Sequence, residues 1–365
     1  MSNASNQPYP IVLQPILKPK VWGGRRLALY GKSLPLDQPI GESWELADLD
    51  STSTTGGGGT PEHSSIANGS LKGKTIQDAI KQWGDALLGD AKLTPTGGFP
   101  LLVKYLDARE HLSVQVHPSI EYANTHADAH LKTESWFVLE AEPDADGNPP
   151  VIYKGFLDGV TKDDLAKAIF EGTVPSIMRK ETVVAGQCHT LPSGTVHALG
   201  AGVLVAEIQT PSDTTFRVYD WAKEYRREGR ELHVEQAVQC ASFEQPLIAE
   251  HAMAFMADDM SMMSTMPPKM GSTHDRVATT DFYTIDVISA SCAAVPMIGN
   301  GDDPNGPLVV MIPKTMGASI VSNTESFEEV VIEPGQTVLI PAACANDAIL
   351  RAGPGTEAIV ARVGS

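Results

Sequence analysis

The sequence predicts a mainly β protein made of two related jelly-roll barrels, with a few helices packed around the first barrel. Most apolar segments are short, rich in Val and Ile, and bounded by Gly or Pro, as in SWFVLEA (135–141) and GVLVAEIQ (202–209). Such segments are typical of strands, and many short strands with few helices favour a sandwich or jelly roll. Residues 184–199 and 333–348 share a Gly-Gln pair followed, after four residues, by Pro. This shared spacing indicates an internal repeat.

Three segments have the apolar spacing of helices, namely 75–88, 161–171 and 234–240. The first begins with a threonine that suits a helix N-cap. The residues expected to face inward are Ile76, Ile80, Trp83 and Leu87 in the first helix and Leu165, Ile169 and Phe170 in the second. The stretch HADAH spaces His126 and His130 four apart, as in a helical metal pair, but it lacks the glutamate of HExxH. We therefore expect a surface helix there.

Composition limits the classes of function. The chain has 365 residues and a net charge of -18, from 27 basic and 45 acidic side chains. This balance argues against a nucleic-acid partner and against an anionic membrane surface, which both require clustered Lys and Arg. No run of 18 apolar residues occurs, and the N-terminal MSNASNQPYP lacks the features of a signal peptide. A cytoplasmic globular protein is the expectation, and its four widely spaced cysteines are expected to be reduced structural thiols.

The chain divides into three parts by composition. We expect a catalytic barrel domain with helical insertions over 1–250, a Met-rich linker over 251–267 and a second barrel over 268–365. The stretch from His251 to Met270 holds seven of the twelve methionines, which favours an irregular linker packed by adaptable side chains over a thioether metal site. Residues 51–60, STSTTGGGGT, read as a flexible loop that interrupts a surface hairpin.

The two repeats differ in one chemically important place. The first continues as Pro192-x-Gly194-x-x-His197, whereas the second has Ala343 and Asn346 at the corresponding positions. The first barrel therefore keeps a histidine that the second has lost. The second barrel is expected to hold no metal and to pack against the first.

The histidine-bearing repeat resembles the second signature of the cupin superfamily, whose jelly rolls hold a metal at the barrel mouth. The first cupin signature supplies a pair of ligands and then a glutamate. In LSVQVHP (112–118), Gln115 and His117 stand where that pair is expected, and Glu134 follows in KTESW. Residues i and i+2 of a strand share a face, so both side chains point inward. The resemblance implies a metal bound by Gln115, His117, Glu134 and His197, and this donor set suits zinc.

A closer resemblance is to one cupin family, type I mannose-6-phosphate isomerase (phosphomannose isomerase) in its short bacterial form. It is dense from residue 18 to about 223 and thinner in the second barrel. The segments that carry it are KPKVWGG (18–24), IGESWELAD (40–48), FPLLVKYLDAREHLSVQVHP (99–118), KTESWFVL (132–139) and LPSGTVHALGAGVLVAEIQTPSDTTFRVYDW (191–221). The resemblance implies an enzyme of mannose metabolism with one zinc ion per chain. It would interconvert mannose 6-phosphate and fructose 6-phosphate through an enediol, as a monomer or weak homo-oligomer.

The resemblance also implies roles for residues outside the ligand set. Arg217 in TTFRVYDW is expected to steady the enediolate, although it could instead pair structurally with Asp213 or Asp220. Glu207 in the EIQ stretch is the expected proton carrier, with a metal-bound water as the alternative. Both are assigned to catalysis.

Substrate binding is assigned to Lys104, Ser113 and Lys132. Lys104, Ser113 and Arg217 suit the phosphate, because an acidic chain needs a local basic pocket for an anionic substrate. Leu131 stands where glycine is common in the family, which affects how Lys132 approaches the barrel mouth.

Two other classes of cupin stay open at this stage. An iron oxygenase would more often use three histidines, or two with a carboxylate, so Gln115 counts against it. A sugar-binding cupin without catalysis would tolerate the loss of ligands in both barrels, whereas the first barrel keeps a complete set.

Overall fold

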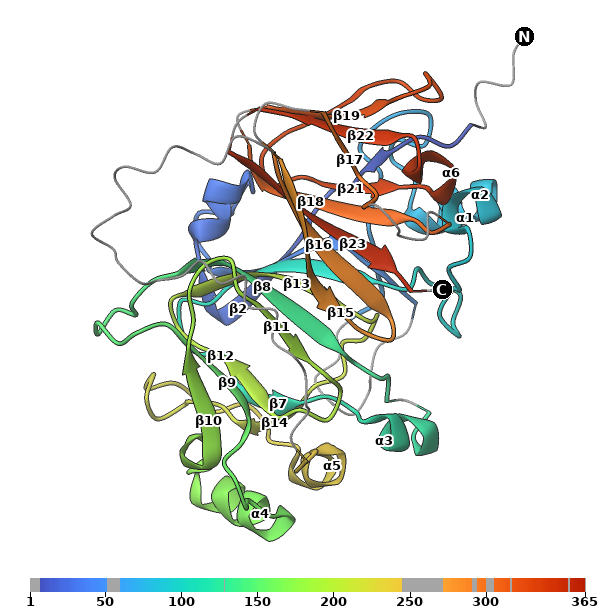
Figure 1. Cartoon of the computed structure of the whole chain (residues 1–365). Coiled ribbons are helices and arrows are strands. Elements are labelled where there is room, and N and C mark those ends of the chain that lie inside the picture. The colour runs from blue at the N-terminus through green and yellow to red at the C-terminus, as the bar shows by residue number, and fades with distance from the viewer. Residues whose placement is uncertain are drawn as a thin grey trace.

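The protein consists of two antiparallel β-barrels placed one above the other, as the computed structural model shows (Figure 1). The structure describes residues 7–50, 60–127, 129–244, 272–290, 294–299, 305–315, 317–353 and 355–364. The first barrel lies at the bottom of Figure 1, and the second, in orange and red, lies at the top. The prediction of a mainly β fold with two cupin-type jelly rolls is confirmed. No helix among these residues has both the length and the apolar character needed to cross a membrane.

Two sheets form the first barrel, which we call the β8 sheet and the β12 sheet. In order across the β8 sheet, the strands are β11 (Cys188–Leu191), β8 (Glu134–Ala141), β13 (Val203–Gln209), β6 (Leu102–Asp107), β3 (Ile40–Leu46) and β2 (Ile16–Gly24). Across the β12 sheet they are β10 (Met178–Thr182), β9 (Val151–Phe156), β12 (His197–Leu199), β7 (Val114–Val116) and β14 (Phe216–Tyr219). The inward faces of these two sheets enclose the candidate site.

The second barrel also has two sheets. The larger contains β1 (Ile11–Val12), β21 (Thr337–Ile340), β18 (Leu308–Lys314), β23 (Thr356–Val363), β16 (Tyr283–Ala290) and β15 (Thr273–Thr279). The smaller contains β17 (Ala294–Pro296), β22 (Ala348–Ala352), β19 (Ala318–Ser322) and β20 (Val330–Ile332). Strand β1 therefore pairs with the second barrel although it comes first in the chain, with Ile11 opposite Leu339. The expected linker, 251–267, lies outside the described residues, and the three-part division of the chain stays a prediction.

The hairpin expected around the Gly-rich segment is present. Strands β4 (Asp48–Leu49) and β5 (Glu62–His63) pair antiparallel on either side of that segment. Residues 51–59 themselves lie outside the described part of the chain.

Three corrections apply to the predicted helices, and the first is that Gly84, with a positive φ of 49°, divides 75–88 into two helices. In the described residues, helices lie at all three predicted segments and at four other places. The helices are η2 (Arg26–Tyr30), α1 (Ile76–Trp83), α2 (Asp85–Leu88), α3 (Ile120–Thr125), α4 (Lys162–Glu171), η3 (Val174–Ile177), α5 (Val234–Cys240) and α6 (Ala342–Ala345). Phe170 is 93% exposed, so its inward placement was wrong. Leu165 and Ile169 already form the buried stripe of α4, and Phe170 points about 100° away from Ile169 around the helix. The expected helix at 126–130 was also wrong, because α3 ends at Thr125 and His126 has an extended backbone.

The internal repeat has a clear structural basis. Gly186 and Gly335 both have positive φ, 91° and 78°, in turns that lead into β11 and β21. The copies diverge after the shared proline. In the first, His197 begins strand β12, whereas in the second a short helix, α6, intervenes and Asn346 only caps it.

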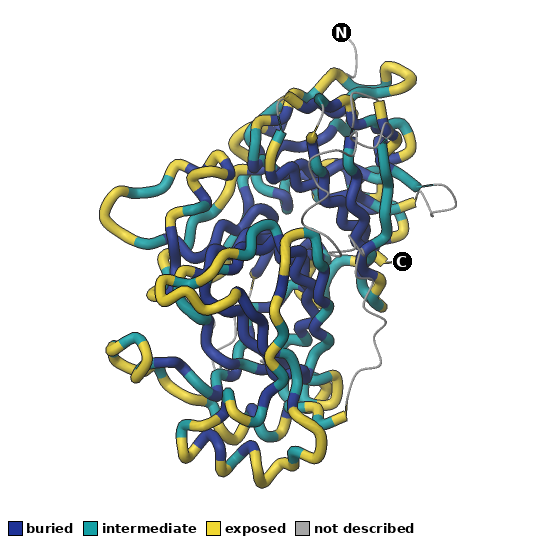
Figure 2. The backbone as a smooth tube through the Cα atoms, turned by 60° about the vertical axis from the view of Figure 1, so that its left-hand side comes forward, coloured by how far each residue is buried: buried dark blue, intermediate teal, exposed yellow. Residues whose placement is uncertain are grey.

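The interiors of the two barrels differ, and a shared apolar core joins their outer faces. Burial is concentrated in the strands of both barrels, while exposed residues gather in the connecting loops (Figure 2). Outward-facing Leu204, Ala206 and Ile208 of β13 belong to one apolar cluster with Ile285 and Val287 of β16. The interior of the second barrel is a separate apolar cluster. The second barrel thus covers apolar strand faces of the first, as the sequence predicts.

A buried polar contact also joins the barrels. The Lys32 ammonium lies 2.7 Å from Glu45 Oε2 and donates to the Gly335 carbonyl at 2.7 Å. The Gly335 turn lies so close to η2 that a Cβ built on it would be 1.7 Å from the Tyr30 carbonyl oxygen. Only glycine suits this turn, because both its φ and its closeness to Tyr30 exclude a side chain.

We therefore predict that Gly335→Ala destabilises the protein much more than Gly355→Ala. Gly355 has a similar φ of 75°, but a Cβ added there would meet nothing within 4 Å. Both substitutions carry the left-handed backbone cost of about 1–2 kcal/mol, and Gly335→Ala adds an overpacking cost of about 1–3 kcal/mol. Urea unfolding of both variants measures the difference. Equal losses of stability in the two variants would contradict the prediction, because they would show that the contact between Gly335 and Tyr30 accommodates a methyl group at no cost in free energy.

Candidate active site

The candidate ligands come from three strands that face the interior of the first barrel. On β8 the inward positions alternate with outward ones, so Glu134 and Trp136 point inward while Ser135 and Phe137 point toward the second barrel. On the opposite sheet, His197 of β12 is paired with Gln115 of β7. His117 follows β7 directly. The strand register thus brings together residues that are far apart in the sequence.

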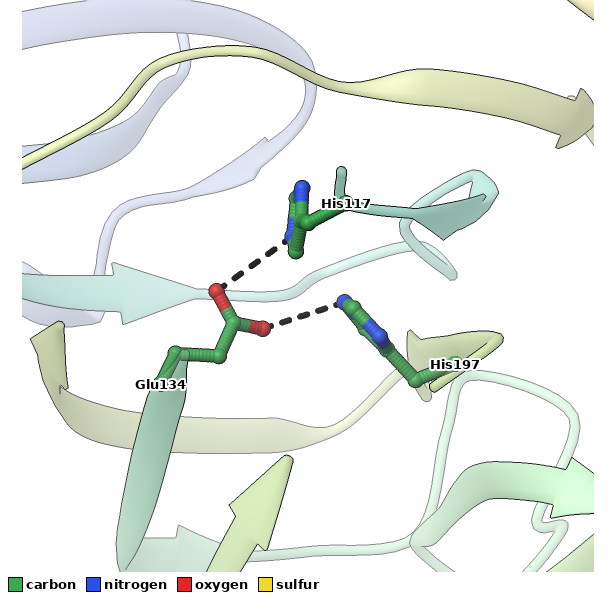
Figure 3. Close-up of side chains that lie close together, drawn as sticks. All are labelled: His117, Glu134 and His197. Carbon is green, nitrogen blue, oxygen red and sulfur yellow. Dashed lines mark ion pairs between the residues drawn. The ribbon is translucent and has the colours of Figure 1, made fainter. Parts of the chain in front are cut away.

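His117, Glu134 and His197 form a compact buried cluster (Figure 3). One ligand atom from each lies within 4.8 Å of the others. The His197 Nε2 atom is 3.0 Å from Glu134 Oε1, and the His117 Nε2 atom is 3.4 Å from Glu134 Oε2. All three side chains are almost inaccessible to solvent.

Backbone carbonyls fix the orientation of both imidazoles. His117 Nδ1–H donates to the Thr214 carbonyl at 2.8 Å, and His197 Nδ1–H donates to the Thr195 carbonyl at 2.8 Å. In this tautomer each Nε2 presents a lone pair to the cluster, which is the arrangement that orients metal-binding histidines. Both Glu134 oxygens are buried, with Oε1 facing His197 and Oε2 lying 2.6 Å from the Lys132 ammonium. Two imidazole nitrogens and an ionised carboxylate that face one another in this way fit a bound metal ion.

The charges around the cluster favour the protonation states that bind metal. Burial and the neighbouring Lys132 ammonium lower the pKa of His117 to about 3, so its imidazole stays neutral. Burial alone would raise the pKa of Glu134, but the charge of Lys132, 2.6 Å from Oε2, and the two histidines hold that pKa well below its usual range. Burial opposes the charge on Lys132, yet Glu134 and Glu207 raise its pKa. Glu134 and Lys132 therefore stay ionised together.

Gln115 and Ser113 lie beside the cluster. The Gln115 Nε2 atom is 3.4 Å from His197 Nε2, and Ser113 Oγ is 3.5 Å from Gln115 Oε1. The structure thus places the amide of Gln115 next to the cluster, with Ser113 behind it.

A second group of charges lies on the β8 sheet next to the cluster. Glu207 of β13 is held on one side by Lys104, 3.0 Å from Oε1, and on the other by Trp136 Nε1, which donates to Oε2 at 3.1 Å. Lys104 also donates to Gln209 Oε1 at 2.7 Å. Lys132 connects the two groups, because its Nζ lies 3.1 Å from His117 Nε2 and 4.0 Å from Glu207 Oε1.

Arg217 lies beside Gln115 in the strand register but directs its guanidinium elsewhere. The two residues are paired between β14 and β7. Arg217 Nη1 donates to the Glu231 carbonyl at 2.8 Å, and Nε lies 3.8 Å from Asp220 Oδ1. Burial and the nearby Arg230 lower the pKa of Arg217 to about 10. The guanidinium of Arg217 thus contacts the 220–231 loop, and this includes the Asp220 pairing considered from the sequence.

Comparison with known proteins identifies the family. The model of the type I phosphomannose isomerase catalytic domain matches residues 11–142. Mannose-6-phosphate isomerase ManA of Bacillus subtilis is 36% identical over 232 residues, 63% of this chain and 67% of the relative. The mannose-6-phosphate isomerase of Streptococcus mutans is 35% identical over 246 residues, 67% of this chain and 71% of the relative. The chain belongs to the type I mannose-6-phosphate isomerase family.

Solved structures agree with this family assignment at the level of the fold. The mannose 6-phosphate isomerase from B. subtilis superposes with a TM-score of 0.71 and 24% identity, covering 96% of this chain and 99% of the other. A zinc-bound mannose 6-phosphate isomerase superposes with a TM-score of 0.65 and 16% identity, covering 98% and 100%. The resemblance noted in the sequence is confirmed, and the chain has the overall fold of this isomerase family.

The sequence patterns did not identify the groups that hold the predicted site residues in position. The carbonyls of Thr195 and Thr214 orient the histidines, and a carbonyl carries no side-chain signal. Trp136 stands in the quoted KTESW motif, and its alternation with Glu134 could have placed it inside the barrel. Gln209 stands in the quoted EIQ stretch two residues after Glu207, so the same alternation could have found it.

The histidine geometry gives a test by nuclear magnetic resonance. In metal-free protein labelled with ¹⁵N-histidine, we expect the His117 ring to be the neutral Nδ1–H tautomer and to stay neutral from pH 8 to pH 5. The lowered pKa, about 3, and the bond to Thr214 are the reasons. Loss of the signal in His117→Ala assigns it. A titration midpoint near 6.5, or an Nε2–H tautomer, would contradict the geometry.

Proposed function

We propose that this chain interconverts mannose 6-phosphate and fructose 6-phosphate with one zinc ion bound in its first barrel. The observation that carries the proposal is the buried cluster of two imidazoles and a carboxylate, in which one ligand atom of each residue lies within 4.8 Å of the others. Its support is the family membership and the relatives named as mannose-6-phosphate isomerases. A zinc-bound isomerase of the same fold supports the choice of metal.

The proposed zinc ligands are His117 Nε2, His197 Nε2, a Glu134 carboxylate oxygen and the Gln115 amide oxygen. The first three already face one another. Gln115 Oε1 and Nε2 exchange places by rotation about the last side-chain bond, which turns the oxygen toward His197. A zinc ion held there supplies Lewis acidity that stabilises negative charge on substrate oxygens. The neutral His117 and the ionised Glu134 are in the protonation states that zinc needs.

Glu207 is the proposed proton carrier. Isomerisation removes a proton from C2 of the aldose and returns one to C1, while a proton moves from O2 to O1, so the product is an isomer of the substrate. Between the two transfers the sugar is an enediol. Trp136 and Lys104 hold one oxygen each of the Glu207 carboxylate, which fixes its position for both transfers.

The proposed substrate contacts are positively charged side chains and one hydroxyl group around the metal-ligand cluster. Lys104, Lys132 and Ser113 face the barrel interior, and Arg217 stands next to Gln115. Ammonium groups and a guanidinium suit the anionic phosphate and the enediolate. We assign Arg217 to the developing charge, because its neighbour Gln115 belongs to the proposed ligand set.

We also propose that the three segments of the chain have different roles. Residues 1–250 form the catalytic domain, and 251–267 link it to a second barrel, 268–365, that binds no metal. In the described part of the second barrel, the interior is filled by apolar side chains that leave no donor set: Ile288, Val310, Ile312, Ile320, Val338, Ile340, Leu350 and Val360 among others.

The first test combines an activity assay with metal removal. We expect purified protein to isomerise mannose 6-phosphate, to lose activity on chelation and to regain it with zinc. His197→Ala should lose stoichiometric zinc and turnover while staying folded, because one imidazole ligand is gone. The matched control is His189→Ala, which removes another buried histidine of the same barrel, on β11. Elemental analysis that finds one zinc per chain in His197→Ala would reject the ligand assignment.

The second test separates catalysis from binding at Arg217. If its guanidinium stabilises the enediolate, Arg217→Ala should lower kcat by on the order of 100-fold with a smaller change in KM. Arg217→Lys keeps a charge and should recover part of kcat. Zinc content is measured in both variants. A raised KM with unchanged kcat would make Arg217 a phosphate anchor, and unchanged constants would make it a structural partner of Asp220.

A further inference from the structure

We infer that Gln209 is a positioning residue of the site: one amide group sets the place of Lys104 and holds the loop that orients His117. The inference rests on the proposed function, since it concerns a proposed zinc ligand and a proposed substrate contact. In this assignment the Gln209 side chain binds neither the metal nor the sugar, although its backbone is paired with that of Glu134 between β13 and β8. It acts through the residues that do.

Both N–H donors and the oxygen of the Gln209 amide form hydrogen bonds inside the barrel. The side chain is 0% exposed at the end of β13, facing inward like Glu207 two residues before it. Its Oε1 accepts from Lys104 Nζ at 2.7 Å. Its Nε2 donates to the Thr210 carbonyl at 2.9 Å and to the Ser212 carbonyl at 2.7 Å. A buried amide with one acceptor contact and two donor contacts has a single rotamer and a single orientation available.

The two donor bonds fix the segment 210–214, which we call the His117 loop. Ser212 Oγ donates to the His130 carbonyl at 3.0 Å and accepts from Thr214 N at 3.2 Å. The Thr214 carbonyl then accepts from His117 Nδ1 at 2.8 Å. The path from Gln209 to the imidazole is therefore a continuous series of hydrogen bonds within one short loop. A shift of the loop would move the carbonyl that selects the His117 tautomer.

The hydrogen bond that Gln209 Oε1 accepts fixes the position of Lys104. Lys104 Nζ lies between Gln209 Oε1 and Glu207 Oε1, at 2.7 and 3.0 Å, and 5.0 Å from the centre of the Trp44 ring. Without Gln209, this buried ammonium would lose one of its two oxygen partners. Glu207, the proposed proton carrier, shares that ammonium. Gln209 thus couples the position of the metal ligand to the position of the catalytic carboxylate.

Only glutamine meets all these requirements at this position. A glutamate of the same length accepts from Lys104 but has no N–H for the carbonyls of Thr210 and Ser212, and its charge repels them. A leucine fills the space and forms none of the bonds. These two substitutions therefore separate the loop contacts from the Lys104 contact with little change in volume.

The experiment measures zinc affinity by chelator competition in wild type, Gln209→Leu and Gln209→Glu, together with kcat, KM and thermal unfolding of the zinc-loaded proteins. Both variants lack the donors to the His117 loop, so both should bind zinc about tenfold more weakly. Gln209→Leu also loses the Lys104 contact, so its kcat should fall by about tenfold and that of Gln209→Glu by less, with KM changed less than kcat in both. Thr337→Val is the control for loss of a buried hydroxyl outside the site, in the second barrel. It should change thermal stability without changing zinc affinity.

Several outcomes overturn the inference. Zinc affinity within twofold of wild type in either folded variant would show that the loop does not depend on Gln209. An equal loss of affinity in Thr337→Val would show a general effect of destabilisation. If Gln209→Leu does not fold, the glutamate variant decides by the same criterion. Failure of the proposed function is seen separately, because wild type would then show no zinc-dependent turnover before any substitution is made.

Discussion

The site depends on two ion pairs buried inside the first barrel. Lys132 with Glu134 and Lys104 with Glu207 place four full charges away from water, at 2.6 and 3.0 Å. Removing one partner of such a pair leaves an uncompensated buried charge, at a cost of about 3–5 kcal/mol. Strand register enforces the second pair, because Glu207 lies opposite Lys104 on β6 and opposite Trp136 on β8. A one-residue slip of β13 would turn Glu207 outward and leave the buried Lys104 ammonium without its carboxylate partner.

The two barrels divide stability and chemistry between them. A barrel that fills part of its interior with charges gives up apolar packing there, so its strands must be stabilised from outside. The outer face of the β8 sheet supplies this by packing against the second barrel, and helices α4 and α5 cover the outer face of the β12 sheet. The described residues of the second barrel form an apolar interior cluster, and its outer face packs against the first barrel. In the second repeat, Asn346 stands at the position that His197 occupies in the first.

Features that repeat or alternate along the sequence could be predicted, whereas contacts between residues that are distant in the sequence could not. Period-two alternation placed Gln115 beside His117, and the shared Gly-Gln-x4-Pro spacing revealed the second barrel. The inward placement of Phe170 was wrong because Leu165 and Ile169, four residues apart, already form the buried stripe of α4. The carbonyls that orient the histidines could not be predicted, since any residue supplies a carbonyl. The guanidinium direction of Arg217 likewise follows from the 220–231 loop rather than from its motif.

The pairing of β1 with β21 has a consequence for how the chain is made. Ile11 and Val12 leave the ribosome before the strands of the first barrel, whereas their partners Leu339 and Val338 emerge after those strands. The first barrel can therefore assemble while β1 still has an open edge. The larger sheet of the second barrel can close on β1 only after β21 has been made.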